Sequence, residues 1–239
     1  MASLLQVPPL RKRARDVLAA IPWLLRATPA TLDRFVAQGT LRGFRRGEVI
    51  CRQGERADAL IVVLSGVIEV STTAPSGNRH ILTHLQTGRL INVVPLLDGE
   101  PTMYDGHAHQ PTSLLYVPAP VVHTAIEAER PLADDIMQLL SFRTRVLAGR
   151  ISDDALMPLS ARCAKMLLVL MEHHGVPQEN GILVDLKLSQ EELSQMLGRS
   201  RQSINQEIRR LEEMGIVETA YSRFVIRNVA ALTAVASNY

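Results

Sequence analysis

Residues 188–217 read LSQEELSQMLGRSRQSINQEIRRLEEMGIV and contain the signals of two short helices joined by a tight turn. Ser189 is followed three residues later by Glu192, a capping box that satisfies two otherwise unpaired backbone N–H groups at a helix start. This first helix is expected to end at Gly198. A second helix is expected to begin at Ser200, because serine is a favourable N-cap residue. Two short helices separated by a glycine turn predict a helix-turn-helix.

The second predicted helix has two faces of opposite character. Apolar residues at helical spacing are expected to form its buried side. They are Ile204, Ile208, Leu211 and Met214. The other side carries long polar side chains of the types that bind base edges, arginine on guanine and glutamine or asparagine on adenine. The predicted base-contacting residues are Arg201, Gln202, Asn205, Gln206 and Arg209.

Basic charge is concentrated on this segment. Four arginines accompany the single acid Glu207, namely Arg199, Arg201, Arg209 and Arg210. An ordinary solvated polar face is the alternative interpretation, but the capped first helix and the acid-poor face favour DNA. Contacts to phosphates position a protein without reading sequence. The candidates for such contacts are Lys187, Ser189, Gln190, Arg199, Ser200 and Ser203.

The segments before and after these two helices also contain signals of helices and strands. After the second helix ends at Gly215, residues 216–217 and 224–226 predict a two-stranded wing joined through residues 221–223. Before the first helix, residues 160–173 predict a helix and residues 181–186 a short strand.

The N-terminal half is divided by glycines, mostly 7 to 12 residues apart, into short apolar or alternating runs. Such runs with turn signals between them predict a β-sandwich or barrel. The predicted strands are residues 48–52, 59–64, 67–71, 80–84 and 114–117. Irregular loops are the alternative, and the β-branched residues argue against it.

A helical period begins after Pro131. The apolar stripe consists of Leu132, Ile136, Leu139 and Val146, with Leu140 and Leu147 alongside. A helix of this length favours pairing of two chains, although Arg143 interrupts the seam and packing on its own barrel is the alternative. We therefore expect a sensor domain at 1–130, a dimerisation helix and hinge at 131–154, and a DNA-binding domain at 155–239.

The chain resembles the catabolite activator/fumarate–nitrate regulator (CRP/FNR) family of bacterial transcription factors. The matching segments are 188–193, 198–205, 211–217, 47–50, 53–54, 57–60, 65–66, Gly88 and 96–101. The resemblance implies an α+β protein with an N-terminal double-stranded β-helix (a cyclic-nucleotide-binding-like β-roll of eight strands), a long dimerisation helix and a C-terminal winged helix-turn-helix. It also implies a homodimer on a palindromic double-stranded DNA operator, with RNA polymerase as a further candidate partner.

The same resemblance bears on specificity. The family's recognition helix contacts bases through positions that match Arg201, Gln202, Asn205 and Gln206. Members similar to the catabolite activator have Glu where Gln202 stands and Arg where Gln206 stands, so a different operator sequence is expected here.

The effector pocket implied by the resemblance is degenerate. Cyclic-nucleotide binders of the family present a Gly-Glu pair for the ribose and, about nine residues on, an Arg for the phosphate. This chain has Asn92-Val93 and Thr102-Met103 at those positions. A buried phosphate with no facing cation is strongly disfavoured. We therefore expect no binding of cyclic AMP in the usual mode, and a regulator controlled only by its own concentration is an alternative.

The resemblance also bears on iron–sulfur and haem cofactors. The family's iron–sulfur sensors carry an N-terminal cysteine cluster, and residues 1–50 contain no cysteine, so no such cluster is expected. Haem stays open as an alternative cofactor. Its candidate ligands are His80, His84, His107, His109 and His123. Cys51 falls in a predicted strand and is interpreted as structural rather than as a redox thiol.

An enzyme of a different class is a further alternative. His107 and His109 resemble the histidine pair of cupin-like metal barrels, but residues 111–116 lack the carboxylate that a facial metal site needs. No catalytic triad, phosphate loop or paired carboxylates stand out, so no enzymatic activity and no metal site are predicted.

Composition sets the remaining expectations. Two cysteines rule out a disulfide scaffold. No apolar run approaches the roughly 20 residues of a membrane span, and Leu4 and Leu5 precede the basic residues 11–15, the reverse of a signal peptide. We therefore expect a cytoplasmic protein without a membrane segment, whose N-terminal basic stretch belongs to a helix packed on the β-domain.

Overall fold

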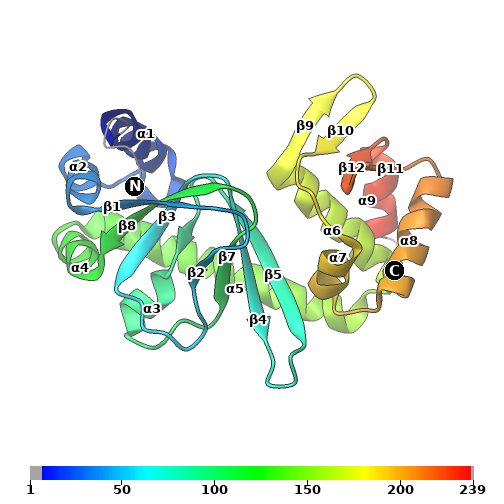
Figure 1. Cartoon of the computed structure of the whole chain (residues 1–239), viewed down its shortest axis with the longest axis horizontal. Coiled ribbons are helices and arrows are strands. Elements are labelled where there is room, and N and C mark those ends of the chain that lie inside the picture. The colour runs from blue at the N-terminus through cyan, green and yellow to red at the C-terminus, as the bar shows by residue number, and fades with distance from the viewer. Residues whose placement is uncertain (1–6, 238–239) are drawn as a thin grey trace. The chain divides into compact units, whose positions relative to one another are not determined.

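The computed structural model describes residues 7–237 (Figure 1). The chain divides into two compact units, Met1–Thr144 and Arg145–Tyr239. Within the described part, no helix combines the length and the apolar character needed to cross a lipid bilayer.

The first unit is built on a β-roll whose described strands form two four-stranded sheets. One sheet has the order β1 (Thr40–Phe44), β8 (Thr112–Pro118), β3 (Ala59–Ser65) and β6 (Leu90–Ile91). The other has the order β2 (Val49–Cys51), β7 (Asp105–Ala108), β4 (Val67–Thr73) and β5 (Arg79–Gln86). All pairings are antiparallel, and a buried apolar cluster draws residues from both sheets, such as Val63 and Ile68. The predicted strands are confirmed.

A single glycine joins the two sheets between β3 and β4. Gly66 has φ +86°, and a Cβ atom there would lie 2.4 Å from the carbonyl oxygen of Pro111. Only glycine fits this left-handed, crowded turn, so the crossing from one sheet to the other depends on it.

Helices cover the β-roll and form a second apolar cluster with it. They are α1 (Val7–Ala20), the 3-10 helix η2 (Pro22–Leu24), α2 (Pro29–Gln38), α3 (Val93–Asp98), α4 (Ala119–Ala128) and α5 (Arg130–Leu156). Leu18 and Phe35 are buried in this cluster. Arg15 pairs with Asp33 at 2.5 Å, so the basic stretch does lie on a helix packed on its own domain. Leu4 and Leu5 lie outside the described residues.

The apolar residues of α5 differ in burial along the helix. Leu132, Ile136 and Leu139 are buried in the core of their own unit, whereas Leu147 is 58% exposed and Ile151 is 72% exposed. The predicted helix is confirmed, and whether its exposed residues pair with a second chain stays a prediction. One face of the first half packs on the β-roll, while Met137 in that half and the apolar side chains of the second half are exposed.

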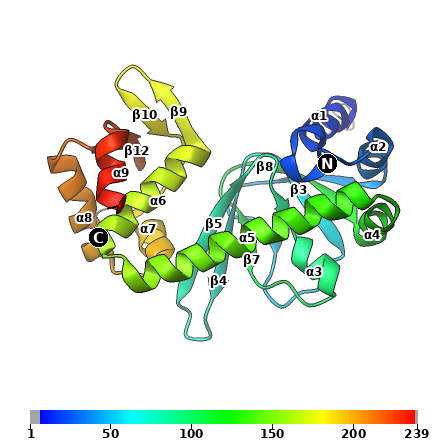
Figure 2. The ribbon, with the colours of Figure 1, turned by 180° about the vertical axis from the view of Figure 1, so that it is seen from behind.

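The second unit is a winged helix-turn-helix. Its elements are α6 (Leu159–His174), β9 (Gly175–Gln178), β10 (Gly181–Val184), α7 (Gln190–Leu197), α8 (Arg201–Glu213), β11 (Val217–Ala220), β12 (Arg223–Ile226) and α9 (Val229–Ser237). The sheet order is β11-β12-β10-β9, and α9 packs on α6 (Figure 2). The predicted helices and wing are confirmed, while β9 and α9 were not anticipated from the sequence.

Candidate nucleic-acid interface

The two central helices are fixed at their starts by side-chain caps. The Ser189 hydroxyl accepts a hydrogen bond from the Glu192 backbone N–H at 3.1 Å, and the Glu192 carboxylate accepts one from the Ser189 N–H at 2.6 Å. The predicted capping box is confirmed. At the second helix, the Ser200 hydroxyl accepts from the Ser203 N–H at 3.2 Å. Local sequence therefore sets where both helices begin.

The turn between the helices is equally well determined. Gly198 has φ +62°, the left-handed conformation that glycine adopts without strain. Its N–H donates to the Ser194 carbonyl, and the Ser194 hydroxyl donates to the Arg199 carbonyl at 2.5 Å. These bonds hold α8 at a fixed angle to α7, as a recognition helix requires.

The buried face of α8 matches the prediction except at its last residue. Ile204, Ile208 and Leu211 are buried, but Met214 is 56% exposed, so its assignment to the core is wrong. The helix ends at Glu213 and the chain turns at Gly215 with φ +67°. Met214 therefore leaves the helical face that its spacing suggested.

The predicted base-contacting residues lie on the opposite face of α8. Arg201, Gln202, Gln206 and Arg209 are exposed, and Asn205 is half-buried. The candidate phosphate contacts come from the segment before α7, its first turn and the start of α8. Lys187, Ser189, Gln190, Arg199 and Ser200 are exposed, and Ser203 is half-buried. The fold thus gathers polar and basic side chains from two helices around the start of α8.

An acid that the sequence reasoning overlooked also lies at this face. Arg201 forms an ion pair with Glu191, which comes from the first turn of α7. Beside it, the Asn205 amide donates to the Gln190 side-chain oxygen at 2.9 Å. The side chains of Arg201 and Glu191 are 63% and 42% exposed, so the ion pair contributes little net free energy.

The wing is tied to the start of α7. Its two-residue turn has φ +50° at Tyr221 and +63° at Ser222, the pattern of a type I′ hairpin turn. The Leu188 N–H donates to the Ser222 carbonyl at 2.8 Å. The wing tip, with its exposed Tyr221, therefore lies beside the segment that carries Lys187 and Ser189.

The four residues predicted to line a degenerate effector pocket differ in burial. Asn92, Val93 and Thr102 are buried, whereas Met103 is exposed. Asn92 adopts a left-handed conformation at the start of α3, and its N–H donates to the Tyr104 hydroxyl at 3.2 Å. The three buried side chains carry no charge.

The five candidate haem ligands occupy different surroundings. His80 is exposed, His107 lies 3.4 Å from an Arg79 nitrogen, and His123 bonds the Leu96 carbonyl at 2.7 Å. Among the described residues, only His84 and His109 join a group of metal-ligating side chains, and the third member is Glu69. Sequence reasoning missed Glu69 because it looked for a carboxylate close to His109 in the chain.

Cys51 lies in β2, and burial raises the pKa of its thiol from 9.0 to about 11. The folded state therefore favours the protonated thiol, and this contribution to stability is lost as the pH rises from 9 through 11. At pH 8 the thiolate fraction falls about 100-fold below that of the unfolded chain.

We expect iodoacetamide at pH 8 to alkylate Cys51 about 100-fold more slowly in the native protein than in guanidinium. Mass spectrometry of the labelled peptide measures this rate. Cys163 serves as an internal comparison, because burial raises its thiol pKa to about 12. Equal alkylation rates for Cys51 in the native and the unfolded protein would contradict the raised thiol pKa and favour Cys51 as a redox thiol.

Comparison with known proteins agrees with this arrangement. Residues 41–129 match the family profile of the cyclic nucleotide-binding domain, and residues 161–235 match that of the Crp-like helix-turn-helix domain. The first match identifies the β-domain as a cyclic nucleotide-binding domain and favours this fold over the cupin-like alternative.

Similar proteins span most of the chain. The global nitrogen regulator of Synechococcus elongatus is 27% identical over 192 residues, which cover 80% of this chain and 86% of that protein. The CRP-like cAMP-activated global transcriptional regulator of Mycobacterium tuberculosis is 24% identical over 191 residues, 80% of this chain and 85% of that protein. The structure of FixK2 from Bradyrhizobium japonicum has a TM-score of 0.74 at 18% identity and covers 84% of this chain and 98% of that one.

Proposed function

The chain belongs to the CRP/FNR family of DNA-binding transcription regulators, and from this we propose that it acts as a homodimer on a palindromic operator. The observation that supports this function most directly is the capped α7–α8 pair, which presents one polar, exposed helix face. In this proposal α8 of each chain enters a major groove.

The exposed face of α5 supports the dimer. Met137, Leu140, Thr144, Leu147 and Ile151 follow one another at alternating steps of three and four residues. This is the heptad spacing of a two-stranded coiled coil. All are exposed except the half-buried Leu140, so the seam is available to a second copy of α5. Arg143, whose side chain instead bonds the Leu90 carbonyl, lies off this seam.

The roles proposed along α8 follow from the chemistry of its face. The ion pair between Arg201 and Glu191 breaks, and Arg201 donates two hydrogen bonds to a guanine. The residues that contact neighbouring base edges are Gln202, Asn205, Gln206 and Arg209. The residues that hold phosphates are Lys187, Ser189, Gln190, Arg199, Ser200 and Ser203. Residues 1–130 act as the sensor, 131–154 transmit its state, and 155–239 bind DNA.

We further propose that the sensor does not use cyclic AMP in the usual mode. Val93 and Thr102 occupy the positions of the family's ribose-binding Glu and phosphate-binding Arg, and both are buried and uncharged. The regulator therefore responds to a different effector or to its own concentration. It acts without catalysis, in the cytoplasm where its operator lies, and RNA polymerase is its candidate partner there.

Selection from a library of random DNA duplexes tests the proposal. The expected result is one enriched motif with two inverted half-sites centred about 34 Å apart, one helical turn. Cyclic AMP added to the binding reaction is expected to leave the affinity for that motif unchanged. No enriched sequence, or a single half-site, contradicts the dimeric operator complex. A gain in affinity with cyclic AMP contradicts only the sensor assignment.

A further inference from the structure

The strand pairing of the β-roll brings two histidines and a glutamate together. Glu69 on β4 lies directly opposite His84 on β5 in the antiparallel register. His109 follows β7, and its N–H donates to the Val67 carbonyl of β4 at 2.9 Å. Backbone hydrogen bonds therefore fix the positions of all three residues independently of contacts between their side chains.

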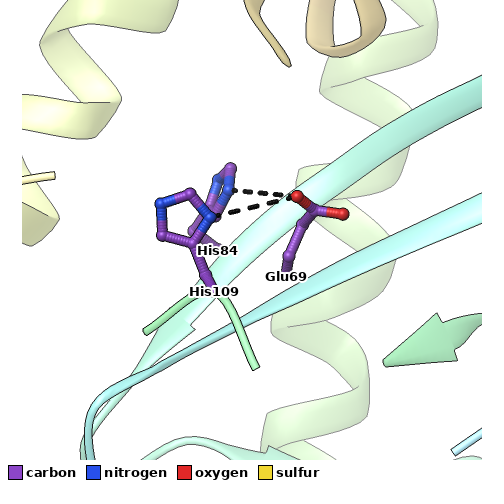
Figure 3. A group of neighbouring side chains, drawn as sticks. All are labelled: Glu69, His84 and His109. Atoms are coloured by element: carbon purple, nitrogen blue, oxygen red, sulfur yellow. Dashed lines mark ion pairs between the residues drawn. The ribbon is translucent and has the colours of Figure 1, made fainter. Parts of the chain in front are cut away.

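The three side chains converge on one point (Figure 3). The Glu69 Oε2 atom lies 4.0 Å from His84 Nε2 and 4.0 Å from His109 Nδ1. All three ligand atoms lie within 4.8 Å of one another. The side chains of Glu69, His84 and His109 are only 6%, 1% and 5% exposed. A buried glutamate is almost always paired, and here both imidazoles face one of its carboxylate oxygens.

Arg79 orients the carboxylate. It forms an ion pair with the Glu69 Oε1 atom, and its Nε donates to the Ser71 hydroxyl at 3.2 Å. One carboxylate oxygen is therefore occupied, while the other faces the two imidazoles. Polar groups that hold a ligating carboxylate in this way are a common feature of metal sites.

The donor set indicates the class of ion. Two imidazole nitrogens and one carboxylate oxygen suit a borderline divalent cation such as Zn²⁺, which takes the same His₂Glu set in known enzymes. Ligands about 2.1 Å from one zinc ion at tetrahedral angles lie about 3.4 Å apart. The two Glu–His separations of 4.0 Å exceed this by about 0.6 Å, and the His–His separation lies within 4.8 Å, so rotation of the three side chains toward one another is needed to close the site.

The positive charge of Arg79 does not exclude a cation here. Zinc is held by three neutral imidazoles in some enzymes, so net negative charge from the protein is not required. From this geometry we propose that Glu69, His84 and His109 form a binding site for a zinc-class divalent metal ion in the sensor domain. Three protein ligands leave a further coordination position for water or an effector group.

Zinc retention tests the site. Full-length protein without a tag is stripped with a chelator, dialysed at about 1 μM free Zn²⁺ and analysed for metal content. We expect about one zinc ion per chain for the wild type. Glu69→Gln, His84→Gln and His109→Gln are each expected to lose more affinity than the roughly 10- to 100-fold that loss of an outer-shell partner costs.

His80→Gln is the matched control, because His80 is an exposed histidine on the same strand as His84. It is expected to retain zinc as the wild type does. A wild type that holds no zinc overturns the proposal. Equal zinc retention by His84→Gln and the wild type does so too, because the ion then lies elsewhere, for example at His173 and His174.

A second readout needs no variant and covers the case in which a substitution prevents folding. Co²⁺-loaded wild-type protein is expected to show two paramagnetically shifted imidazole N–H resonances, one from each ligating histidine. Absence of both overturns the proposal. Neither measurement uses DNA, so the metal site and the operator-binding function fail or succeed separately.

Discussion

Arg201→Ala is expected to weaken binding to the selected operator by about 30-fold or more. A bidentate arginine–guanine contact contributes about 1–3 kcal/mol of discrimination, and a homodimer loses two of them. Binding to unrelated DNA is expected to fall much less, because phosphate contacts supply nearly all of it. Fluorescence anisotropy titrations with the operator and with a scrambled duplex measure both affinities at one salt concentration.

Arg210→Ala is the matched control for this substitution. Arg210 is an exposed arginine in the last turn of the same helix, and its loss changes the charge equally. It is expected to leave the ratio of specific to unspecific affinity unchanged. If Arg201→Ala preserves this ratio as well, Arg201 does not read a base.

Glu191→Gln probes the ion pair itself. Because the exposed pair is worth about 0.2–1 kcal/mol per chain, releasing Arg201 is expected to raise operator affinity about 2- to 30-fold in a dimer. The double variant Glu191→Gln/Arg201→Ala is expected to lack this gain. A gain that persists without Arg201 reflects only the removed negative charge.

Leu147→Asp is expected to raise the dissociation constant of the dimer by about 100-fold or more. Burial of one leucine side chain stabilises by about 1.5–3 kcal/mol, and a two-fold symmetric seam contains two copies. The introduced carboxylate adds a desolvation cost at the same place. Sedimentation velocity over a range of protein concentrations measures the effect.

Leu156→Asp is the control for this experiment. Leu156 lies on the same helix and is 73% exposed, but it falls outside the heptad positions of Leu147 and Ile151. Its substitution is expected to leave the dissociation constant unchanged. If both variants dimerise as the wild type does, the two chains do not pair along α5.

Much of the DNA-binding unit could be predicted because its signals are local. Ser189 and Glu192 lie three residues apart, so the capping box depends only on the chain near it. The same holds for Gly198, whose left-handed turn is a property of one residue and its neighbours. Spacing also located the polar face of α8, since a helix repeats every 3.6 residues whatever surrounds it.

Other features could not be predicted because they join distant residues. The pairing of Arg201 with Glu191 requires the angle between two helices, which no spacing rule supplies. The apolar residues of α5 look alike in sequence, yet Leu139 is buried in its own unit and Ile151 is exposed. Which of them faces the β-roll depends on how the helix docks there.

The amino-acid sequence by itself determined the order of the elements, the helix caps and turns, and the polar face of α8 on which the proposed base contacts lie. These depend on interactions within a few residues. Only the tertiary structure placed Glu69 beside His84 and His109, because strand register brings together side chains 15 and 40 positions apart. Interactions between residues near in sequence set the helices, strands and turns. Tertiary packing set which ionisable side chains lie together in the interior of the β-roll.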